Sequence, residues 1–429
     1  MKKEKQYEAI EKMMERVREA FGAEHKIARM FEKCISNTLD TTIKRDENGK
    51  IFVITGDIPA MWLRDSSCQL RPFLLFAKEE PEILEIIRDL VKRQMECILI
   101  DPYANAFNES ANGNGFQDDR TEMKPELWER KYEIDSLCFP FQLSYQLWKN
   151  TGCTAQFDEN WKKAAKRIVE VFRTEQYHEE KSPYYFERKN CVYTDTLSRG
   201  GKGALVKSGT GLIWSGFRPS DDACTYGYLI PSNMLASVVL SEMAQVSREV
   251  LADEAFAAEA ESFSVEVRKA IEEYAIVPGH QKEFYPYEVD GYGQYNIMDD
   301  ANIPSLLAMP YIGYCKKNAE RYLNTREVIL SEWNPYYYCG SALQGIGSPH
   351  TPHSYVWMIA LCVQGLTSES REEKEKILEM VCNADAGTDL MHESVCKDDP
   401  QQYTRPWFSW ANSVFCEFVI DYLGASVKM

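Results

Sequence analysis

The sequence predicts an all-α protein, and the number and order of its helices favour an (α/α)6 toroid with minor β-hairpins in the loops. About a dozen segments carry apolar residues at helical spacing, whereas strand patterns are confined to 50–56 and to a hairpin over 183–195. No repeat of fixed length, as expected of an α-solenoid, is present. No Pro-, Gly- or Ser-rich linker separates two helical bundles. We therefore expect residues 1–429 to form a single domain.

Each helix is predicted from apolar residues at positions i, i+3 and i+4. In 156–176 this spacing places Trp161, Ile168 and Phe172 on one face, and 370–384 adds a charged, solvated face. The predicted helices cover, in order, residues 5–22, 25–43, 65–77, 80–99, 133–149, 156–176, 230–248, 252–275, 302–315, 319–331, 353–365, 370–384 and 407–423. In a toroid they supply an inner ring of helices surrounded by an outer ring.

The acidic composition argues against several classes of partner. The net charge is −17, from 66 acidic and 49 basic residues, and no run of Lys or Arg suits nucleic acid or an anionic membrane. No apolar stretch is long enough to span a bilayer, and the charged N-terminal segment lacks the apolar core of a signal peptide. The thirteen cysteines form no CxxC pair, which argues against a disulfide framework. We expect a cytoplasmic protein, and the sequence does not indicate its oligomeric state.

Six long loops rich in polar and aromatic residues separate the helices. Structureless loops of this length are uncommon in a compact domain and are usually functional. They cover residues 50–66, 101–132, 177–229, 277–303, 332–353 and 385–406. Because they recur between helical pairs, we expect them to gather at one mouth of the toroid and to form a cleft there.

Two pairs of adjacent aspartates, Asp221–Asp222 and Asp299–Asp300, each lie shortly before an apolar helix start. The simplest interpretation is that one member of each pair stabilises a helix N-terminus, an effect of about 0.3–1 kcal/mol. Asp65 has the same interpretation as a helix cap. This interpretation leaves the aromatic residues around both pairs unexplained.

The remaining polar groups favour carbohydrate chemistry over metal chemistry. His350 and His353 are three residues apart, but neighbouring prolines disfavour the helix that a metal-binding pair needs. Calcium loops, phosphate-binding loops, GxSxG and Cys/His protease patterns are incomplete or absent. Glu393 lies in the last loop, near Arg405 and an aromatic segment. Two carboxylates and an aromatic cleft are what glycoside hydrolysis requires.

Seven motifs, spread over nearly the whole chain from about residue 30 to 424, resemble one known family in order and composition. They are MWLRDSS (61–67), SGFRPSDDA (215–223), YLIPSNM (228–234), MDDANIPSLL (298–307), SPHTPHSYVW (348–357), HES (392–394) and RPWFSWANS (405–413). Together they resemble glycoside hydrolase family 125, the bacterial and fungal exo-α-1,6-mannosidases. The set is specific, whereas a bare Asp-Asp pair alone is not.

The resemblance implies an inverting enzyme of (α/α)6 fold, without metal or cofactor, that removes non-reducing-terminal α-1,6-linked mannose from N-glycan-type oligosaccharides. It implies a general acid at Asp221 or Asp222 and a general base at Glu393. The motif does not fix which aspartate is the acid, and we favour Asp221. The residues implied to bind substrate are Trp62, Arg64, Asp65, Asp299, Asp300, His353, Arg405 and Asn412, and Trp128, Tyr292 and Trp407 are further candidate stacking platforms.

This mechanism carries two physical expectations. For inversion the two carboxyl groups should lie roughly 6.5–9.5 Å apart, which leaves room for a water beside Glu393. The acid must stay protonated near neutral pH, and we expect the adjacent carboxylate to raise its pKa. Two alternatives are a sugar isomerase or epimerase on the same toroid, which would use His350 or His353, and a glycan-binding protein without catalysis.

Overall fold

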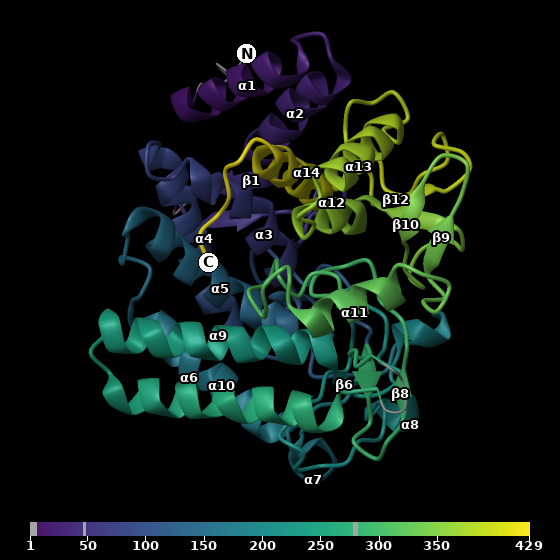
Figure 1. Ribbon diagram of the computed structural model, residues 1–429. Coiled ribbons are helices and arrows are strands. Elements are labelled where there is room, and N and C mark those ends of the chain that lie inside the picture. Colours follow the sequence, from purple (N-terminus) through teal and green to yellow (C-terminus); the bar gives the residue numbers. More distant parts are fainter. Residues whose placement is uncertain (1–6, 46–48, 278–281) are drawn as a thin grey trace.

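Helices dominate the computed structural model, which describes residues 7–45, 49–277 and 282–429 (Figure 1). The longer helices are α1 (Glu8–Phe21), α2 (Lys26–Asn37), α3 (Leu63–Leu70), α4 (Pro81–Ile100), α5 (Ile134–Thr151), α6 (Glu159–Glu175), α9 (Ile230–Glu249), α10 (Glu254–Tyr274), α11 (Glu320–Ile329), α12 (Met358–Leu366), α13 (Arg371–Asn383) and α14 (Ser409–Tyr422). The short segments α7 (His178–Lys181) and α8 (Ser198–Gly201) lie in the third long loop. The predicted helical class is confirmed.

Twelve short strands form small antiparallel sheets within the described residues. They are β1 (Ile43–Arg45), β2 (Ile51–Val53), β3 (Met61–Trp62), β4 (Ala106–Phe107), β5 (Leu127–Glu129), β6 (Tyr228–Leu229), β7 (Glu288–Val289), β8 (Tyr295–Asn296), β9 (Tyr337–Cys339), β10 (Gln344–Ile346), β11 (Tyr355–Trp357) and β12 (Ser394–Cys396). The sheets are β1–β2, β3–β4–β5, β6–β7–β8, β9–β10 and β11–β12. Ile43 lies opposite Val53, so the strand predicted over 50–56 is confirmed as β2.

Inner and outer helices alternate along the chain. In the inner ring α3 packs against α5 and α14, α5 packs against α9, and α12 packs against α14. Behind them lie α4 and α6 against α5, α10 against α9, α13 against α12, and α2 against α14. Figure 1 shows α9 and α10 running side by side as one such pair. This arrangement is the predicted (α/α)6 toroid.

The burial of each helix follows from its place in the ring. The inner helices α5 and α9 are buried on nearly all sides, and even the polar Asp135 and Gln142 of α5 lie in the interior. The outer helix α6 instead buries one face that includes Trp161 and Phe172. Asp158 caps α6, because its side chain accepts hydrogen bonds from the first free backbone N–H groups.

The long loops are tied to one end of the inner helices. Strands β3, β6 and β11 directly precede α3, α9 and α12, respectively. Each of these strands pairs with a strand from another loop: β3 with β4, β6 with β7, and β11 with β12. The first turns of the inner helices therefore face the same loop-covered mouth, as expected from the spacing of the loops.

The prediction of a helix over 302–315 is wrong, because this stretch forms turns. Pro310 has no N–H to donate, and its ring would clash with the carbonyl of Leu306 in a continuous helix. Gly313 then turns the chain with a φ of +83°. The segment still occupies an inner-ring position: Gln142 of α5 donates to the Ile312 carbonyl at 3.1 Å.

The hairpin predicted over 183–195 is also wrong. Glu187 pairs instead with Arg120 of the preceding loop. The backbone N–H of Arg120 donates to the carbonyl oxygen of Glu187 at 2.8 Å. The residues Tyr193–Asp195 form a 3-10 turn. Ion pairs from Arg188 to Asp119 across the two loops favour this distant partner over a local strand.

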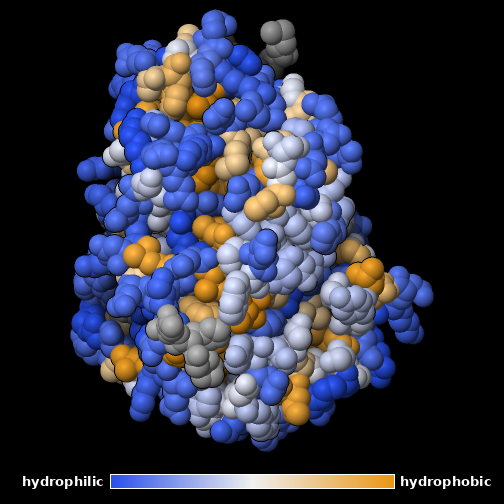
Figure 2. Space-filling view, turned by 45° about the vertical axis from the view of Figure 1, so that its right-hand side comes forward, coloured by the Kyte–Doolittle hydropathy of each residue, from blue (hydrophilic) through white to orange (hydrophobic). Residues whose placement is uncertain are grey.

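The face shown in Figure 2 is largely hydrophilic, and its hydrophobic residues form small separate patches. Within the part of the chain that the structure describes, no helix combines the length and apolarity needed to cross a membrane.

Candidate active site

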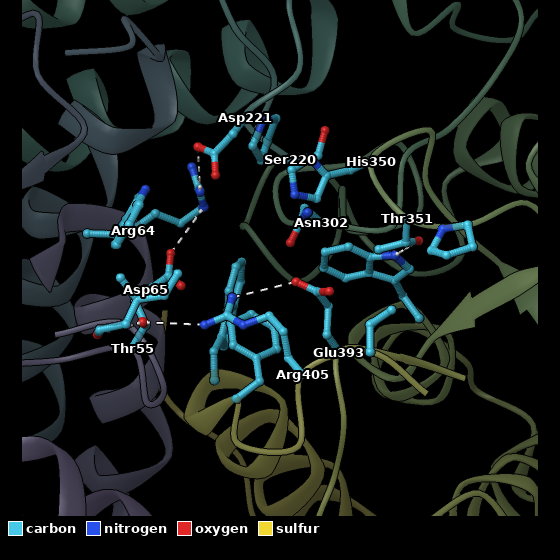
Figure 3. Close-up of a pocket in the computed structure, with 18 residues that line it drawn as sticks. Thr55, Arg64, Asp65, Ser220, Asp221, Asn302, His350, Thr351, Glu393 and Arg405 are labelled. Carbon is cyan, nitrogen blue, oxygen red and sulfur yellow. Dashed lines mark hydrogen bonds and ion pairs between the residues drawn. The ribbon is translucent and has the colours of Figure 1, made fainter. Parts of the chain in front are cut away.

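A pocket of about 250 Å³, here called the inner pocket, lies where the loops meet the first turns of α3, α12 and α14 (Figure 3). It is small compared with the roughly 300–1,000 Å³ of typical ligand pockets. Its walls are lined by Thr55, Ile58, Trp62, Arg64, Asp65, Pro219, Ser220, Asp221, Asn302, His350, Thr351, Pro352, Trp357, Glu393, Thr404, Arg405, Phe408 and Trp410. Residues far apart in the sequence thus converge on one polar and aromatic space.

The start of α3 supplies one wall with Trp62, Arg64 and Asp65. Trp62 ends β3, and Arg64 and Asp65 occupy the first turn of α3, so all three side chains are held by the β3–β4 pairing. All three are buried. Asp65 therefore contributes to the pocket wall as well as to the negative charge of the first helical turn.

Arg64 is surrounded by an excess of carboxyl groups. Its guanidinium lies 2.6 Å from Glu133, 3.0 Å from Asp135, 3.6 Å from Asp65 and 3.9 Å from Asp221. The side chains of Arg64, Glu133 and Asp135 are at most 3% exposed. Because buried carboxylates need compensating charge, burial raises the pKa of both Glu133 and Asp135 against the opposing charge of Arg64.

Asp221 is held in an unusual backbone conformation. Its φ is +69°, in the left-handed region that non-glycine residues rarely adopt. Lys131 fixes this conformation by donating to the Asp221 carbonyl at 2.8 Å, and Asn105 donates to the Asp221 carboxylate at 3.2 Å. Strained residues of this kind cluster at functional sites.

Glu393 lies across the inner pocket from Asp221, as Figure 3 shows. It directly precedes β12, and its Oε1 lies 3.5 Å from the guanidinium of Arg405. Arg405 also has a left-handed φ, +44°, and is tied to Asp57 by hydrogen bonds of 3.1 and 3.2 Å. The two carboxylates thus face the same space from separate elements.

A second, larger space of about 590 Å³, here called the outer pocket, adjoins the inner one. The two pockets share Ile58, Trp62, Asp221 and His350 as lining residues. Asp222 lines only the outer pocket, and Glu393 lines only the inner pocket. Asp221 therefore lies at the junction, whereas its neighbour Asp222 does not.

The model of one protein family, described as metal-independent α-mannosidase, matches residues 24–420. The chain belongs to glycoside hydrolase family 125. It is 40% identical over 444 residues to the meiotically up-regulated gene 157 protein of Schizosaccharomyces pombe, which covers 97% of this chain and 86% of that protein.

Two solved structures resemble this family 125 chain to different degrees. A metal-independent α-mannosidase from Streptococcus pneumoniae, in a non-productive complex with α-1,6-mannobiose, is 46% identical with a TM-score of 0.94, covering 97% of this chain and 99% of the other. A bacterial glucoamylase in complex with acarbose has a TM-score of 0.55 at 10% identity, covering 86% of this chain and 49% of the other. The second likeness shows a shared fold alone.

Two neighbouring carboxyl groups of the family 125 site, Asp221 and Glu133, have pKa values shifted in opposite directions. Burial raises the pKa of Asp221, but the charges of Lys131, Arg64 and His350 outweigh burial and leave the pKa below its ordinary value. Burial raises the pKa of Glu133 well above its usual range, opposed by Arg64 and reinforced by Asp221. Of the two carboxyl groups, Glu133 with its raised pKa therefore favours the protonated form, and Asp221 with its lowered pKa favours the carboxylate.

The expectation that Asp222 raises the pKa of Asp221 is wrong. The Asp222 carboxylate lies 3.5 Å from the His350 ring, whose positive charge reaches Asp221 as well. Burial alone would lower the pKa of His350, but its contact with Asp222 and the charges of Asp222, Asp221 and Glu393 raise it to about 9. Burial raises the pKa of Asp65 to about 6, against the opposing charges of Arg64 and Arg405.

Four predicted substrate-binding residues lie outside the pocket walls. Asp299 accepts hydrogen bonds from the backbone N–H groups of Leu306 and Leu307 at 2.8 and 2.9 Å, so it caps the turn segment. Asp300 lies behind the wall and accepts a hydrogen bond from Ser220 at 2.8 Å.

The other two are His353 and Asn412. The chain turns at Ser354, with φ +71°, and leaves His353 exposed against Tyr338 while His350 enters the pocket. Asn412 is buried in α14, where its side-chain oxygen accepts from the backbone N–H of Met391 at 2.9 Å. Asn412 thus holds the segment that leads to Glu393.

Of the candidate stacking platforms, Trp62 lines both pockets and Trp128 lines the outer one. Tyr292 and Trp407 line neither pocket. Lys131, Glu133 and Trp357 were not expected from the sequence as parts of the site. Lys131 and Glu133 directly precede an apolar helix in KYEIDS, and charged residues at that place were the available signal.

The family is described as metal-independent. Among residues 7–45, 49–277 and 282–429, no group of three or more His, Cys, Asp or Glu side chains is arranged to hold a metal ion.

Proposed function

We propose that this family 125 enzyme is an inverting exo-mannosidase that removes terminal α-1,6-linked mannose, with Asp221 as general acid and Glu393 as general base. The linkage is supported by the relative from Streptococcus pneumoniae, which is 46% identical and binds α-1,6-mannobiose. The observation that carries the assignment of roles is the position of Asp221 at the junction of two pockets.

This position suits an acid that protonates the bond between two sugar units. With the terminal mannose in the inner pocket and the leaving chain in the outer pocket, the glycosidic oxygen crosses the junction beside Asp221. Glu393 lies across the inner pocket, where it activates a water on the opposite face of the mannose ring. Asp222 lines the outer pocket alone and serves to hold His350.

The proton that the reaction needs comes from the Glu133–Asp221 pair. The raised pKa of Glu133 favours its protonated form, and the lowered pKa of Asp221 favours its carboxylate. As the glycosidic bond breaks, the departing oxygen becomes a strong base and draws the proton through Asp221. Glu133 does not reach the substrate, so it acts as a positioning residue that supplies Asp221.

The terminal mannose is recognised by charged groups with fixed positions. Arg64 and Asp65 are buried at the start of α3, and Arg405 is anchored by Asp57. A site built to hydrogen-bond particular hydroxyl groups rejects an analogue that leaves those groups unpaired. These three residues therefore select mannose over glucose.

The proposal is tested by incubating the enzyme with α-1,6-, α-1,2- and α-1,3-mannobiose and following the products by NMR. We expect release of mannose from the α-1,6 disaccharide, with β-mannose appearing first. Initial release of α-mannose would contradict inversion, and an isomerised disaccharide without free mannose would instead support the sugar isomerase alternative. Binding of the disaccharide without turnover would support a glycan-binding protein.

The choice between the two aspartates is tested by Asp221→Asn and Asp222→Asn. Loss of general acid catalysis typically costs about 10²–10⁴-fold in rate, and we expect this loss in kcat for Asp221→Asn only. A greater loss for Asp222→Asn would reverse the assignment.

The cellular setting is part of the same proposal. The thirteen cysteines are all free thiols, as is usual in a reducing compartment such as the cytoplasm. N-glycan-type oligosaccharides are the proposed natural substrates, since the relative from Streptococcus pneumoniae is described in the context of N-linked glycan processing. Fractionation of cells with an antibody against the protein measures its location.

A further inference from the structure

The outer pocket is more than twice as large as the inner one, about 590 Å³ against about 250 Å³. If the inner pocket holds one sugar ring, the outer pocket has room for more than the single unit that a disaccharide would place there. Its extra volume leaves room for a second unit of the leaving chain.

The rim of the outer pocket is unusually apolar for an exposed surface. Tyr193 is 88% exposed, Val192 is 67% exposed and Phe116 is 42% exposed. These are three of the ten large apolar side chains with high exposure among the described residues, and all three line this one pocket. Scattered exposed apolar residues are ordinary, but a cluster in a concave surface marks a binding site.

The Phe116 side of the rim is held in place by several contacts. Phe116 packs edge-on against Trp128, with ring centroids 6.5 Å apart, and the Arg188 guanidinium lies 3.7 Å from the Phe116 centroid. Arg188 is itself fixed by Asp119 at 2.6 Å and by Glu129 at 2.8 Å. A preorganised rim of this kind costs little entropy when a ligand binds.

The charges of the outer pocket favour a neutral ligand. Lys131 is paired with Asp195, Arg188 with Glu129 and Asp119, and His350 with Asp222. Thus no cation that lines the pocket, among the described residues, is left to neutralise an anionic ligand. Asp221 adds a further carboxylate to the wall. A phosphorylated or carboxylated chain would be disfavoured.

We propose that the outer pocket binds two neutral sugar units of the leaving oligosaccharide, the second of them against the exposed side chains of Phe116 and Tyr193. This inference rests on the proposed exo-mannosidase activity and extends it to the length of the preferred substrate. The first unit lies next to Asp221, and the second covers the apolar rim, whose planar rings match the apolar face of a sugar.

The test compares kcat/KM for linear α-1,6-linked mannobiose, mannotriose and mannotetraose. We expect kcat/KM to rise about tenfold from the disaccharide to the trisaccharide, equivalent to about 1.4 kcal/mol of transition-state binding. No further rise is expected for the tetrasaccharide, because the pocket is then full. Equal values for the disaccharide and the trisaccharide would overturn the inference while leaving the proposed activity intact.

Two variants and a matched control show whether the rim residues cause the rise in kcat/KM from the disaccharide to the trisaccharide. Tyr193→Ala and Phe116→Ala should each bring the ratio of trisaccharide to disaccharide kcat/KM towards one. Tyr292→Ala removes an equally polar aromatic side chain, 63% exposed but outside both pockets, and should preserve the ratio. A ratio that falls equally in all three variants would refute the role of the rim.

A binding measurement keeps the inference independent of turnover. Calorimetric titration of the Glu393→Gln variant with mannobiose and mannotriose should show tighter binding of the trisaccharide, and adding Tyr193→Ala should remove the difference. Tighter binding of the trisaccharide without hydrolysis in the wild-type enzyme would support the site and overturn the proposed activity. Equal affinities would overturn the site.

Discussion

At the scale of single residues, Asp221 combines a strained backbone with a carboxyl group whose pKa is lowered by the surrounding positive charges, against the effect of burial. A left-handed conformation costs roughly 1–2 kcal/mol for most residues, although aspartate tolerates it better than a branched residue. Lys131 and Asn105 hold the strained residue in place. The structure thus fixes the position of Asp221, and in the proposed mechanism Glu133 stores the proton.

Replacing Glu133 tests whether this residue stores the proton that Asp221 donates. Glu133→Gln keeps the shape of the protonated side chain but removes the acidic proton that could be passed to Asp221. We expect kcat to fall roughly 10²-fold, at the lower end of the range for acid–base catalysis. The alkaline limb of the pH–rate profile should move to lower pH, because Asp221, with its lowered pKa, then titrates alone. Steady-state rates across pH measure both effects.

The control for this variant is Glu242→Gln. Glu242 lies on α9, is buried like Glu133 and has a pKa raised by burial, but it lines neither pocket. Its replacement should leave the pH profile unaltered. A profile for Glu133→Gln that matches the wild type would exclude Glu133 as the holder of the proton.

His350 gives a second pH-dependent prediction, of opposite sign. Its pKa of about 9 keeps the ring charged at neutral pH, and this charge lowers the pKa of Asp221. In His350→Gln the pKa of Asp221 should therefore rise, which moves the alkaline limb of kcat/KM to higher pH. A His353→Gln control, at an exposed position outside the pocket, should show no movement. A shift to lower pH in His350→Gln would show that its charge does not act on the acid.

At the scale of elements, the loop over 108–117 forms part of the outer pocket through one close backbone approach. Gly115 has a φ of +90°, and a Cβ at this position would lie 2.3 Å from the Trp128 carbonyl oxygen. The N–H of Phe116 donates to that same carbonyl at 2.8 Å. Only glycine lets the loop pack here, so Phe116 and Trp128 depend on it for their positions.

Substituting this glycine should therefore alter substrate binding more than chemistry. In Gly115→Ala the loop is displaced from Trp128, and we expect KM for mannotriose to rise about tenfold, with a smaller change in kcat. Gly113→Ala is a matched control in the same loop, since its φ is also positive, +68°, but a Cβ there meets nothing within 4 Å. Equal effects of the two substitutions would attribute the loss to backbone strain instead of to the contact with Trp128.

The elements that the sequence predicted best are those whose stability is local. Helices such as α6 follow from the spacing of Trp161, Ile168 and Phe172, because an amphipathic face needs no distant information. The failures involve partners remote in sequence or a single residue that breaks a pattern. Pro310 interrupts an apolar run that otherwise has helical spacing, and Glu187 pairs with Arg120 some distance away in the sequence.

The motifs predicted which loops meet at the active site, and this part of the site could be predicted from the sequence. Arg64, Asp65, Asp221, Glu393 and Arg405 were all expected near the cleft, and all line the inner pocket. Motifs do not show which of two neighbouring side chains faces the cavity, because a single backbone turn decides it. The turn at Ser354 turns His353 away, and the hydrogen bonds of Asp299 direct it to the backbone.

At the scale of the whole molecule, a buried cluster ties the first inner element to the last. Arg71, just after α3, forms an ion pair with Glu417 of α14, and the Tyr311 hydroxyl donates to the same carboxylate at 2.8 Å. The Arg71 guanidinium also lies 3.8 Å from the Tyr311 ring centroid. The cluster therefore links α14, the turn segment and the region after α3 around the ring.

Removing one partner of this cluster should destabilise the toroid. Glu417→Ala leaves the buried Arg71 without its carboxylate, and loss of one member of a buried ion pair costs about 3–5 kcal/mol. The midpoint of thermal unfolding should fall, while KM for mannobiose should stay close to that of the wild type. Glu242→Ala removes an equally buried glutamate that has no ion pair in the described part of the chain, and its effect on the midpoint should be smaller. Equal losses would show that the ion pair itself contributes little.

The small volume of the inner pocket limits which glycans can be shortened. At about 250 Å³, with Arg64, Asp65 and Arg405 packed around it, the pocket has room for one unsubstituted sugar ring. On the proposed function, we expect a mannose that already carries a second sugar as a branch to be excluded. Successive removal of terminal units should then stop at the first branch point, so every chain is expected to end as a limit product defined by its own branching. The architecture of the glycan, and not the duration of digestion, sets where trimming ends.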